Sequence, residues 1–143
     1  MYMYTKLNKH YILCFTTMFF LLPIIYIIYK NKCYLPPYLI ILLLLSVFLS
    51  LLFWCNVINN KNNIYHTLDA FFARITIISF IIYNIYLKNF NYPFFISTFI
   101  MLFFYYISHI NSKQLWCCNN HIFYHIFAHV FGLLSIYFTM FPI

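Results

Sequence analysis

Five long apolar runs, separated by short polar connectors, form the dominant pattern of this chain. They lie near residues 11–29, 38–55, 68–87, 93–110 and 121–141. Each run matches the roughly 20 apolar residues that a helix needs to cross the hydrocarbon layer of a bilayer. Lipid excludes open sheets, because their unpaired backbone groups would find no partner there. The pattern therefore predicts an all-α, polytopic membrane helix bundle with about five transmembrane helices, in a single domain over residues 1–143.

The composition supports this prediction. Hydrophobic residues make up 66% of the chain, and only 6% of the residues are charged. Because so little polar surface cannot cover a water-soluble globule, we expect an integral, multi-pass membrane protein surrounded by membrane lipids. Nucleic-acid binding is disfavoured, because the lysines are dispersed and form no basic patch with accessible aromatic rings.

The lysines of the connectors bear on orientation. If the crossings alternate, the side of the membrane that holds the N-terminus also holds Lys6, Lys9, Lys61 and Lys113. The other side then holds Lys30, Lys32 and Lys88. The positive-inside rule then favours a cytosolic N-terminus by a single residue. The pattern does not indicate which membrane holds the protein.

The few polar side chains in or beside the apolar runs gather at one face. They are Ser50, Trp54, His66, Asp69, His109, His121 and His125. Because each crossing reverses direction, the end of the second run, the start of the third, the end of the fourth and the start of the fifth share that face. Ionisable groups are costly in hydrocarbon and are functional candidates there, so we expect one inward-facing cluster.

His121 and His125 form an H-x3-H element at the start of the last run. Residues four apart lie on one face of a helix, a spacing at which two imidazoles can bind one zinc ion. His129 continues the same stripe but lies about 12 Å along the helix from His121, too far to share its metal. We therefore expect His129 to be a buried, hydrogen-bonding histidine or a residue that supports the metal ligands from behind.

Asp69 is the one acidic residue of the protein. At the predicted start of the third run, the helix dipole would stabilise the Asp69 carboxylate and Thr67 could cap the helix. Asp69 could also pair with Arg74. Its alternative role is that of a general base, or of a carboxylate that orients a histidine or a metal-bound water. The two interpretations are compatible.

The other members of the cluster each have an ordinary structural interpretation. A serine such as Ser50 commonly serves helix packing, Trp54 has the position of an interfacial belt residue, and His109 that of an interfacial histidine. Adjacent Cys117 and Cys118 are open to membrane-edge packing, palmitoylation or metal ligation. Five cysteines, one of them inside a span, do not suit a full disulfide framework.

The order of these residues resembles the transmembrane hydrolase superfamily that contains alkaline ceramidases, the progestin and adipoQ receptors and the myomaker-like proteins. The similar segments are His121-Ile-Phe-Tyr-His125-Ile-Phe-Ala-His129-Val-Phe-Gly132, and the Leu-Asp helix start within residues 66–74. They belong to roughly the last 95 residues. The resemblance implies zinc bound by three histidines, a serine and an aspartate beside it, and hydrolysis of lipid amides.

Carried over to this chain, the resemblance implies that His121 and His125 are zinc ligands and that Asp69 and Ser50 are catalytic residues. The sequence departs from the family at Trp54, which stands where S-x3-H has its third histidine, and five spans replace the usual seven. A third ligand would then have to come from His66, His109 or Cys118.

We therefore predict a zinc-dependent hydrolase of membrane lipid amides or esters. A non-enzymatic small membrane subunit, or an accessory protein of a larger membrane complex, is the main alternative. A second alternative is a haem-binding membrane protein, with haem held between histidines of neighbouring helices such as His109 and His125.

Overall fold

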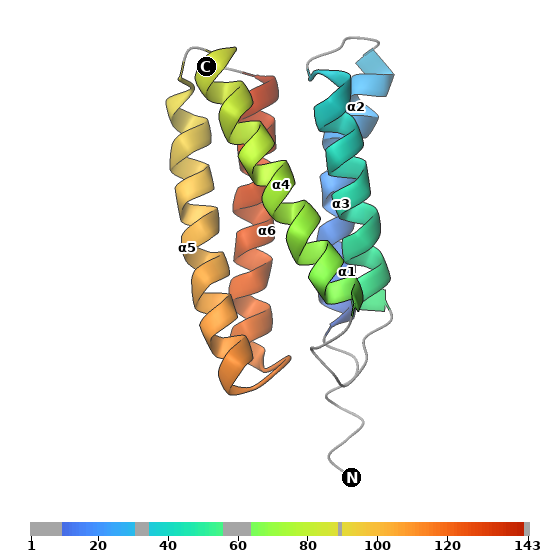
Figure 1. Cartoon of the computed structure of the whole chain (residues 1–143), viewed down its shortest axis with the longest axis vertical. Helices are drawn as coiled ribbons and strands as arrows, with labels where there is room; N and C mark the ends of the chain where they lie inside the picture. The colour runs from blue at the N-terminus through green and yellow to red at the C-terminus, as the bar shows by residue number, and fades with distance from the viewer. Residues whose placement is uncertain (1–9, 31–34, 56–63, 89, 142–143) are drawn as a thin grey trace.

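The described part of the chain is a bundle of helices in this computed structural model, which describes residues 10–30, 35–55, 64–88 and 90–141. The helices are α1 (Tyr11–Met18), α2 (Leu22–Lys30), α3 (Pro37–Cys55), α4 (Ile64–Tyr86), α5 (Tyr92–Gln114) and α6 (Asn119–Met140) (Figure 1). A 3₁₀ turn joins α1 to α2, so together they make one span. The described residues contain five helices long and apolar enough to cross a membrane. The all-α fold and the multi-pass membrane location are therefore confirmed.

Pro23 interrupts the α-helical hydrogen bonding of the first span. Pro23 has no backbone N–H, so the carbonyl of Phe19, four residues earlier, cannot receive its α-helical bond. Instead the N–H of Leu22 donates to the Phe19 carbonyl, which closes the tighter 3₁₀ turn Phe19–Leu21. The span is thus two helical segments with a joint between them.

Two apolar clusters hold the bundle, one toward each end. The larger is built around Leu39, Phe80 and Phe94, with Ile136 of α6. At the other end, α1 and α3 meet α6 through the second cluster, which consists of Leu13, Cys14, Phe53, Trp54 and Ile122. The second cluster lies at the end where the polar residues gather.

Polar side chains join the helices at the far end, where α4 ends and α5 begins. Asn84 of α4 donates to Thr139 of α6 at 2.9 Å, and Asn91 donates to the carbonyl of Phe138 at 2.6 Å. Such interhelical bonds contribute about 0.6 kcal/mol on average in a membrane. They tie α4, α5 and α6 together away from the candidate site.

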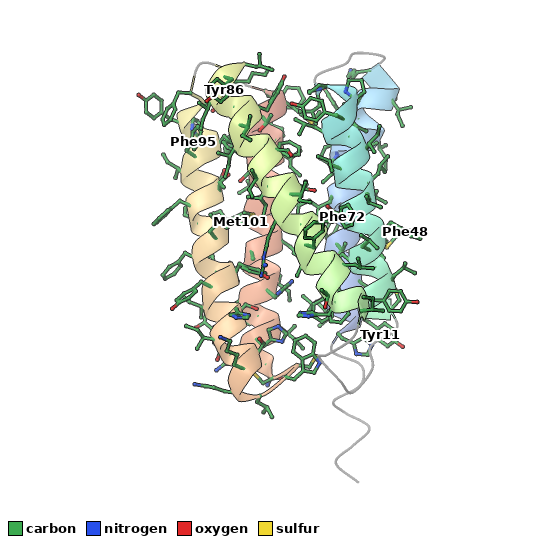
Figure 2. All side chains as sticks on the ribbon, in the orientation of Figure 1. Tyr11, Phe48, Phe72, Tyr86, Phe95 and Met101 are labelled. Carbon is green, nitrogen blue, oxygen red and sulfur yellow. The ribbon has the colours of Figure 1, made fainter. Side chains whose placement is uncertain are left out.

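The outer surface carries large apolar side chains. Phe48 and Tyr86 are 58% and 77% exposed, and both point away from the bundle (Figure 2). Exposed side chains of this type fit hydrocarbon and the interfacial region, where Tyr is enriched.

Two helix boundaries differ from the predicted ones by four residues. The structure describes α4 from Ile64 rather than 68, and α5 extends to Gln114 rather than 110. In the extension of α5, Asn111 and Ser112 bond back to the carbonyls of Ile107 and His109. Polar residues end an apolar run without ending a helix, so hydropathy marks the membrane edge and not the helix end.

Consecutive spans run in opposite directions, which places Lys30 and Lys88 at one end and Lys113 at the other (Figure 1). This agrees with the predicted sides. The remaining lysines of that prediction lie outside the described residues: Lys6, Lys9, Lys32 and Lys61.

Cysteine labelling tests the topology. In sealed vesicles, we expect Lys113→Cys to gain one label from a membrane-impermeant maleimide on one side only, and Lys88→Cys on the opposite side only. Lys30→Cys is the control and should behave like Lys88→Cys. Labelling of Lys113→Cys and Lys88→Cys from the same side would contradict the arrangement.

Candidate functional site

A cavity of about 370 Å³ lies among the helices, and residues from α1, α3, α4, α5 and α6 line it. The lining includes all seven members of the cluster predicted from the sequence: Ser50, Trp54, His66, Asp69, His109, His121 and His125. The structure therefore brings these residues to one cavity, as the alternating directions of the helices predict. Four different helices contribute them.

Ser50 and Asp69 face the cavity from α3 and α4. Their side chains are hydrogen-bonded to each other, and Ser50 is 9% exposed. Asp69 lies in the second turn of α4, because the helix is already formed at Ile64. The prediction of a first-turn carboxylate capped by Thr67 is therefore wrong, and a capping role does not account for Asp69.

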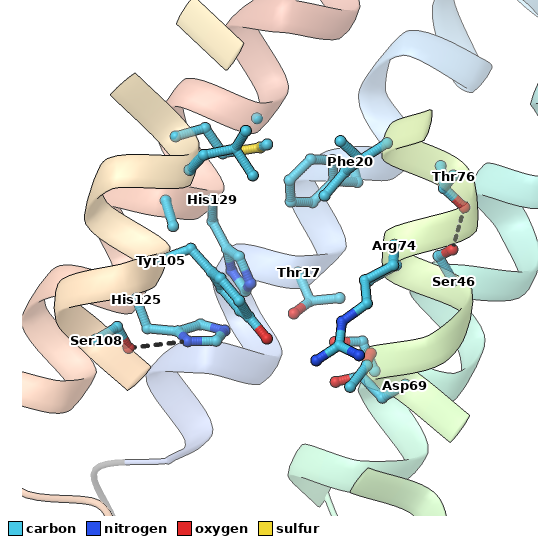
Figure 3. Close-up of a pocket in the computed structure, with 18 of the residues that line it drawn as sticks. Thr17, Phe20, Ser46, Asp69, Arg74, Thr76, Tyr105, Ser108, His125 and His129 are labelled. Atoms are coloured by element: carbon cyan, nitrogen blue, oxygen red, sulfur yellow. Dashed lines mark hydrogen bonds between the residues drawn. The ribbon is translucent and has the colours of Figure 1, made fainter. Parts of the chain in front are cut away.

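Arg74 also lines the cavity, and its guanidinium extends on the same side as Asp69 (Figure 3). Within the described residues no ion pair between the two side chains is recorded, and the interaction that the structure gives the Asp69 carboxyl is its hydrogen bond with Ser50. The interpretation of Asp69 as the ion-pair partner of Arg74 is therefore wrong for this structure. The carboxylate has its hydrogen bond from α3 instead.

His121 and His125 face the cavity from α6, with ring centres 5.7 Å apart. Ser108 of α5 lies between them: its hydroxyl is 3.2 Å from Nδ1 of His125 and donates to the carbonyl of His121 at 3.1 Å. The bond to Ser108 fixes the orientation of the His125 imidazole and leaves Nε2 toward the cavity. Figure 3 shows His125 on the side opposite Asp69.

His129 has the hydrogen-bonding role that was predicted. Its Nδ1 lies 2.8 Å from the hydroxyl of Thr16 on α1, and its ring centre is 4.8 Å from that of His125. His129 therefore links α1 to the histidine stripe of α6.

Trp54 is not a belt residue at the surface. It is 2% exposed and packs against the imidazoles from α3, with ring centres 5.4 Å from His125 and 6.2 Å from His121. On its other side it stacks on Trp116 at 5.9 Å. Position 54 therefore points a side chain at the histidine pair, and the indole fills that place.

His66 and His109 stand at the margins of the cluster. The ring of His66 packs near Phe53 at 5.0 Å and near Trp116 at 5.8 Å. His109 lines the cavity but is itself exposed. Both imidazoles therefore belong to the cavity wall.

The two adjacent cysteines of the α5–α6 connector have structural surroundings. The sulfur of Cys118 accepts the N–H of His121 at 3.3 Å and caps α6. Burial, and to a smaller extent the neighbouring Cys118, raises the pKa of the Cys117 thiol to about 11. Because the thiolate is the reactive and metal-binding form, Cys117 is unreactive at neutral pH, which favours the packing interpretation.

The histidine pair meets part of what zinc requires. Two imidazoles on one tetrahedral zinc have ring centres roughly 5 Å apart, close to the 5.7 Å between His121 and His125. A catalytic zinc normally has three protein ligands. Among the described residues, however, no three His, Cys or acidic side chains are close enough to share one ion. In this conformation the chain offers a pair of ligands and not a complete set.

The cavity opens between α4 and α5. Four of its lining residues are also exposed: Arg74 on α4, and Leu102, Tyr105 and His109 on α5. The first three lie near the middle of their helices, and His109 lies nearer the end of α5. The opening therefore extends along the side of the bundle.

Comparison with known proteins adds no relative. No family model, curated protein or solved structure matches the chain. The superfamily resemblance therefore rests on the residues alone and stays a hypothesis.

Several residues of the site were missed by the sequence analysis. They are Thr16, Tyr105, Ser108 and Trp116. Thr16 and Ser108 carried a usable signal, because a hydroxyl inside an apolar run needs a partner within the protein. Tyr105 and Trp116 carried none in a chain in which a quarter of all residues are aromatic.

A double-mutant cycle tests the relation between Asp69 and Arg74. Asp69→Asn, Arg74→Gln and the double variant should show additive changes in unfolding free energy, within about 0.5 kcal/mol, because no ion pair is lost. Thermal unfolding in detergent measures this. A coupling above about 1 kcal/mol would reveal a pair that the structure lacks.

Proposed function

We propose that the protein is a hydrolase of membrane lipid amides or esters, with the cavity as its active site. The observation that carries the proposal is the meeting of two polar pairs in one membrane-embedded cavity. Ser50 and Asp69 line one wall, and His121 and His125 line another. A carboxylate, a hydroxyl and imidazoles around one space are the groups that acid–base hydrolysis uses.

The shape of the cavity favours a lipid as substrate. Its lining runs along α6 from His121 to Ile136, which is roughly 22 Å of helix. The imidazoles and the carboxylate lie toward the end near His121, and Phe80 and Phe94 line the more apolar end. An amphiphile entering through the lateral opening can place its carbonyl at the polar end and an acyl chain along the rest.

The side chains have distinct roles in this proposal. The attacking water loses a proton to the carboxylate of Asp69, which the hydroxyl of Ser50 orients through their hydrogen bond. The protonated Asp69 then gives this proton to the leaving amine or alkoxide, and Ser108 fixes the orientation of the His125 imidazole. Zinc is the cofactor that His121 and His125 suit; in such sites it polarises a carbonyl and activates water.

An unsatisfied donor supports a polar occupant of the cavity. Nε1 of Trp54 is buried and has no hydrogen-bond partner among the described residues. Leaving a buried N–H without a partner costs about 1–3 kcal/mol. A lipid carbonyl or a water in the cavity, which Trp54 lines, would satisfy it.

The experiment is a combined assay of metal content and turnover. Protein reconstituted with zinc should hydrolyse a fluorogenic long-chain amide or ester, and His121→Ala and His125→Ala should each lose metal, measured by elemental analysis. Asp69→Asn should keep the metal but reduce turnover by about 100-fold or more, because an amide accepts no proton.

His10→Ala is the matched control, since His10 lies before α1 and does not line the cavity. It should retain both metal and turnover. A protein that binds no zinc and turns over neither lipid class would contradict the proposal.

A non-enzymatic membrane subunit is the second candidate, and the observation that favours it is Trp54. The Trp54 indole occupies the place from which a third ligand would reach a zinc ion held by the two imidazoles. In an accessory protein the cavity would bind a lipid without chemistry. The two histidines of the haem hypothesis, His109 and His125, both line the cavity. Haem binding stays a prediction.

Trp54→His tests whether position 54 is a ligand position. We expect this variant to bind zinc at least about tenfold more tightly than the unaltered protein, because an imidazole there completes a set of three. Titration against a chelating indicator measures the affinity. Trp54→Phe is the control and should gain nothing. An unchanged affinity in Trp54→His would show that position 54 does not meet the histidine pair.

A further inference from the structure

Cys14 of α1 and Cys55 of α3 are separated by 41 positions in the sequence, yet their sulfur atoms are 3.3 Å apart. Both are free thiols. Cys14 is buried and Cys55, the last residue of α3, is exposed. The exposed thiol of one span therefore lies next to the buried thiol of another span.

We propose that Cys14 and Cys55 are a redox-active pair, which forms a reversible disulfide by exchange with a small-molecule disulfide such as glutathione disulfide. The gap between the sulfur atoms has to close by about 1.3 Å to reach the bond length of a disulfide. Cys55 sits at the very end of its helix, where the backbone can supply this movement.

The exchange balances in two steps. The thiolate of Cys55 attacks one sulfur of glutathione disulfide, and one glutathione leaves as its thiolate. The thiol of Cys14 then attacks the Cys55 sulfur and the second glutathione leaves, taking up the proton that Cys14 loses. Two electrons pass from the cysteine pair to the glutathione, which departs as two thiols. Because small disulfides reach Cys55 and not Cys14, the order of the two steps is fixed.

The pair lies beside the candidate site but does not depend on its function. Cys14 packs in the same apolar cluster as Trp54 and Ile122, and Cys55 follows Trp54 directly in the chain. The disulfide would staple the last turn of α3 to α1 and hold Trp54 against the histidine pair. This holds whether the cavity is an active site or a lipid-binding site.

Thiol counting on the full-length protein tests the proposal. The detergent-purified protein is equilibrated with glutathione buffers of stepped redox potential, quenched with acid, unfolded in SDS and labelled with a maleimide that adds mass. All five cysteines should be labelled under reducing conditions and three under oxidising conditions. Peptide mass spectrometry should then show Cys14 linked to Cys55.

Two variants and one stability measurement complete the test. Cys55→Ser should keep all four of its remaining thiols under oxidising conditions, whereas the matched control Cys117→Ser/Cys118→Ser should still lose two. Oxidation should raise the Tm of the unaltered protein by roughly 5 °C or more, because the staple restricts the unfolded chain. The proposal is overturned by five labelled thiols after oxidation, by a glutathione adduct that stays on Cys55, or by a disulfide from Cys14 to Cys117.

Discussion

Hydrocarbon offers a polar side chain no hydrogen-bond partner, and this constraint organises the bundle. Every hydroxyl, amide or imidazole inside a span has to find a partner within the protein. Ser46 and Thr76 meet at 2.6 Å between α3 and α4, and Ser97 meets Ser135 at 2.9 Å between α5 and α6. Because these partners belong to different helices, satisfying the polar groups also fixes how the helices face one another.

The same constraint makes the cavity informative. Packing alone would fill the centre of a small bundle with apolar side chains. Here the centre is hollow, and a carboxylate, a guanidinium and several imidazoles line it. Natural proteins place costly groups inside a membrane where function requires them, so the cavity is the part of the molecule most directly tied to its role.

The sequence predicted the fold well, because hydropathy and helix length in a membrane follow from the same physics. The five spans, the inward cluster and the hydrogen-bonding role of His129 were all accessible from residue spacing. The start of α4 was not accessible in this way. Ile64 to Thr67 are helical, but they mix helix-forming and interfacial residues, so hydropathy does not distinguish them from a connector. Asp69 was consequently placed one turn too early.

The contacts between spans were less accessible. Nothing in the sequence pairs Ser108 with His125, or turns Trp54 inward and not toward the membrane surface. These outcomes depend on the rotation of each helix about its axis, which is set by packing against neighbours. Short apolar helices with aromatic residues on all sides leave that rotation undetermined until the whole bundle is assembled.

The 3₁₀ turn before Pro23 divides the first span into two parts with different contacts. The segment α1 holds His129 through Thr16, whereas α2 contributes Ile24 and Ile27 to the apolar core at the opposite end. A 3₁₀ turn advances the side chains by about 120° per residue, against about 100° in an α-helix. The turn Phe19–Leu21 therefore changes which positions of α2 face the bundle relative to those of α1, so that one span can serve the cavity with one face and the apolar core with another.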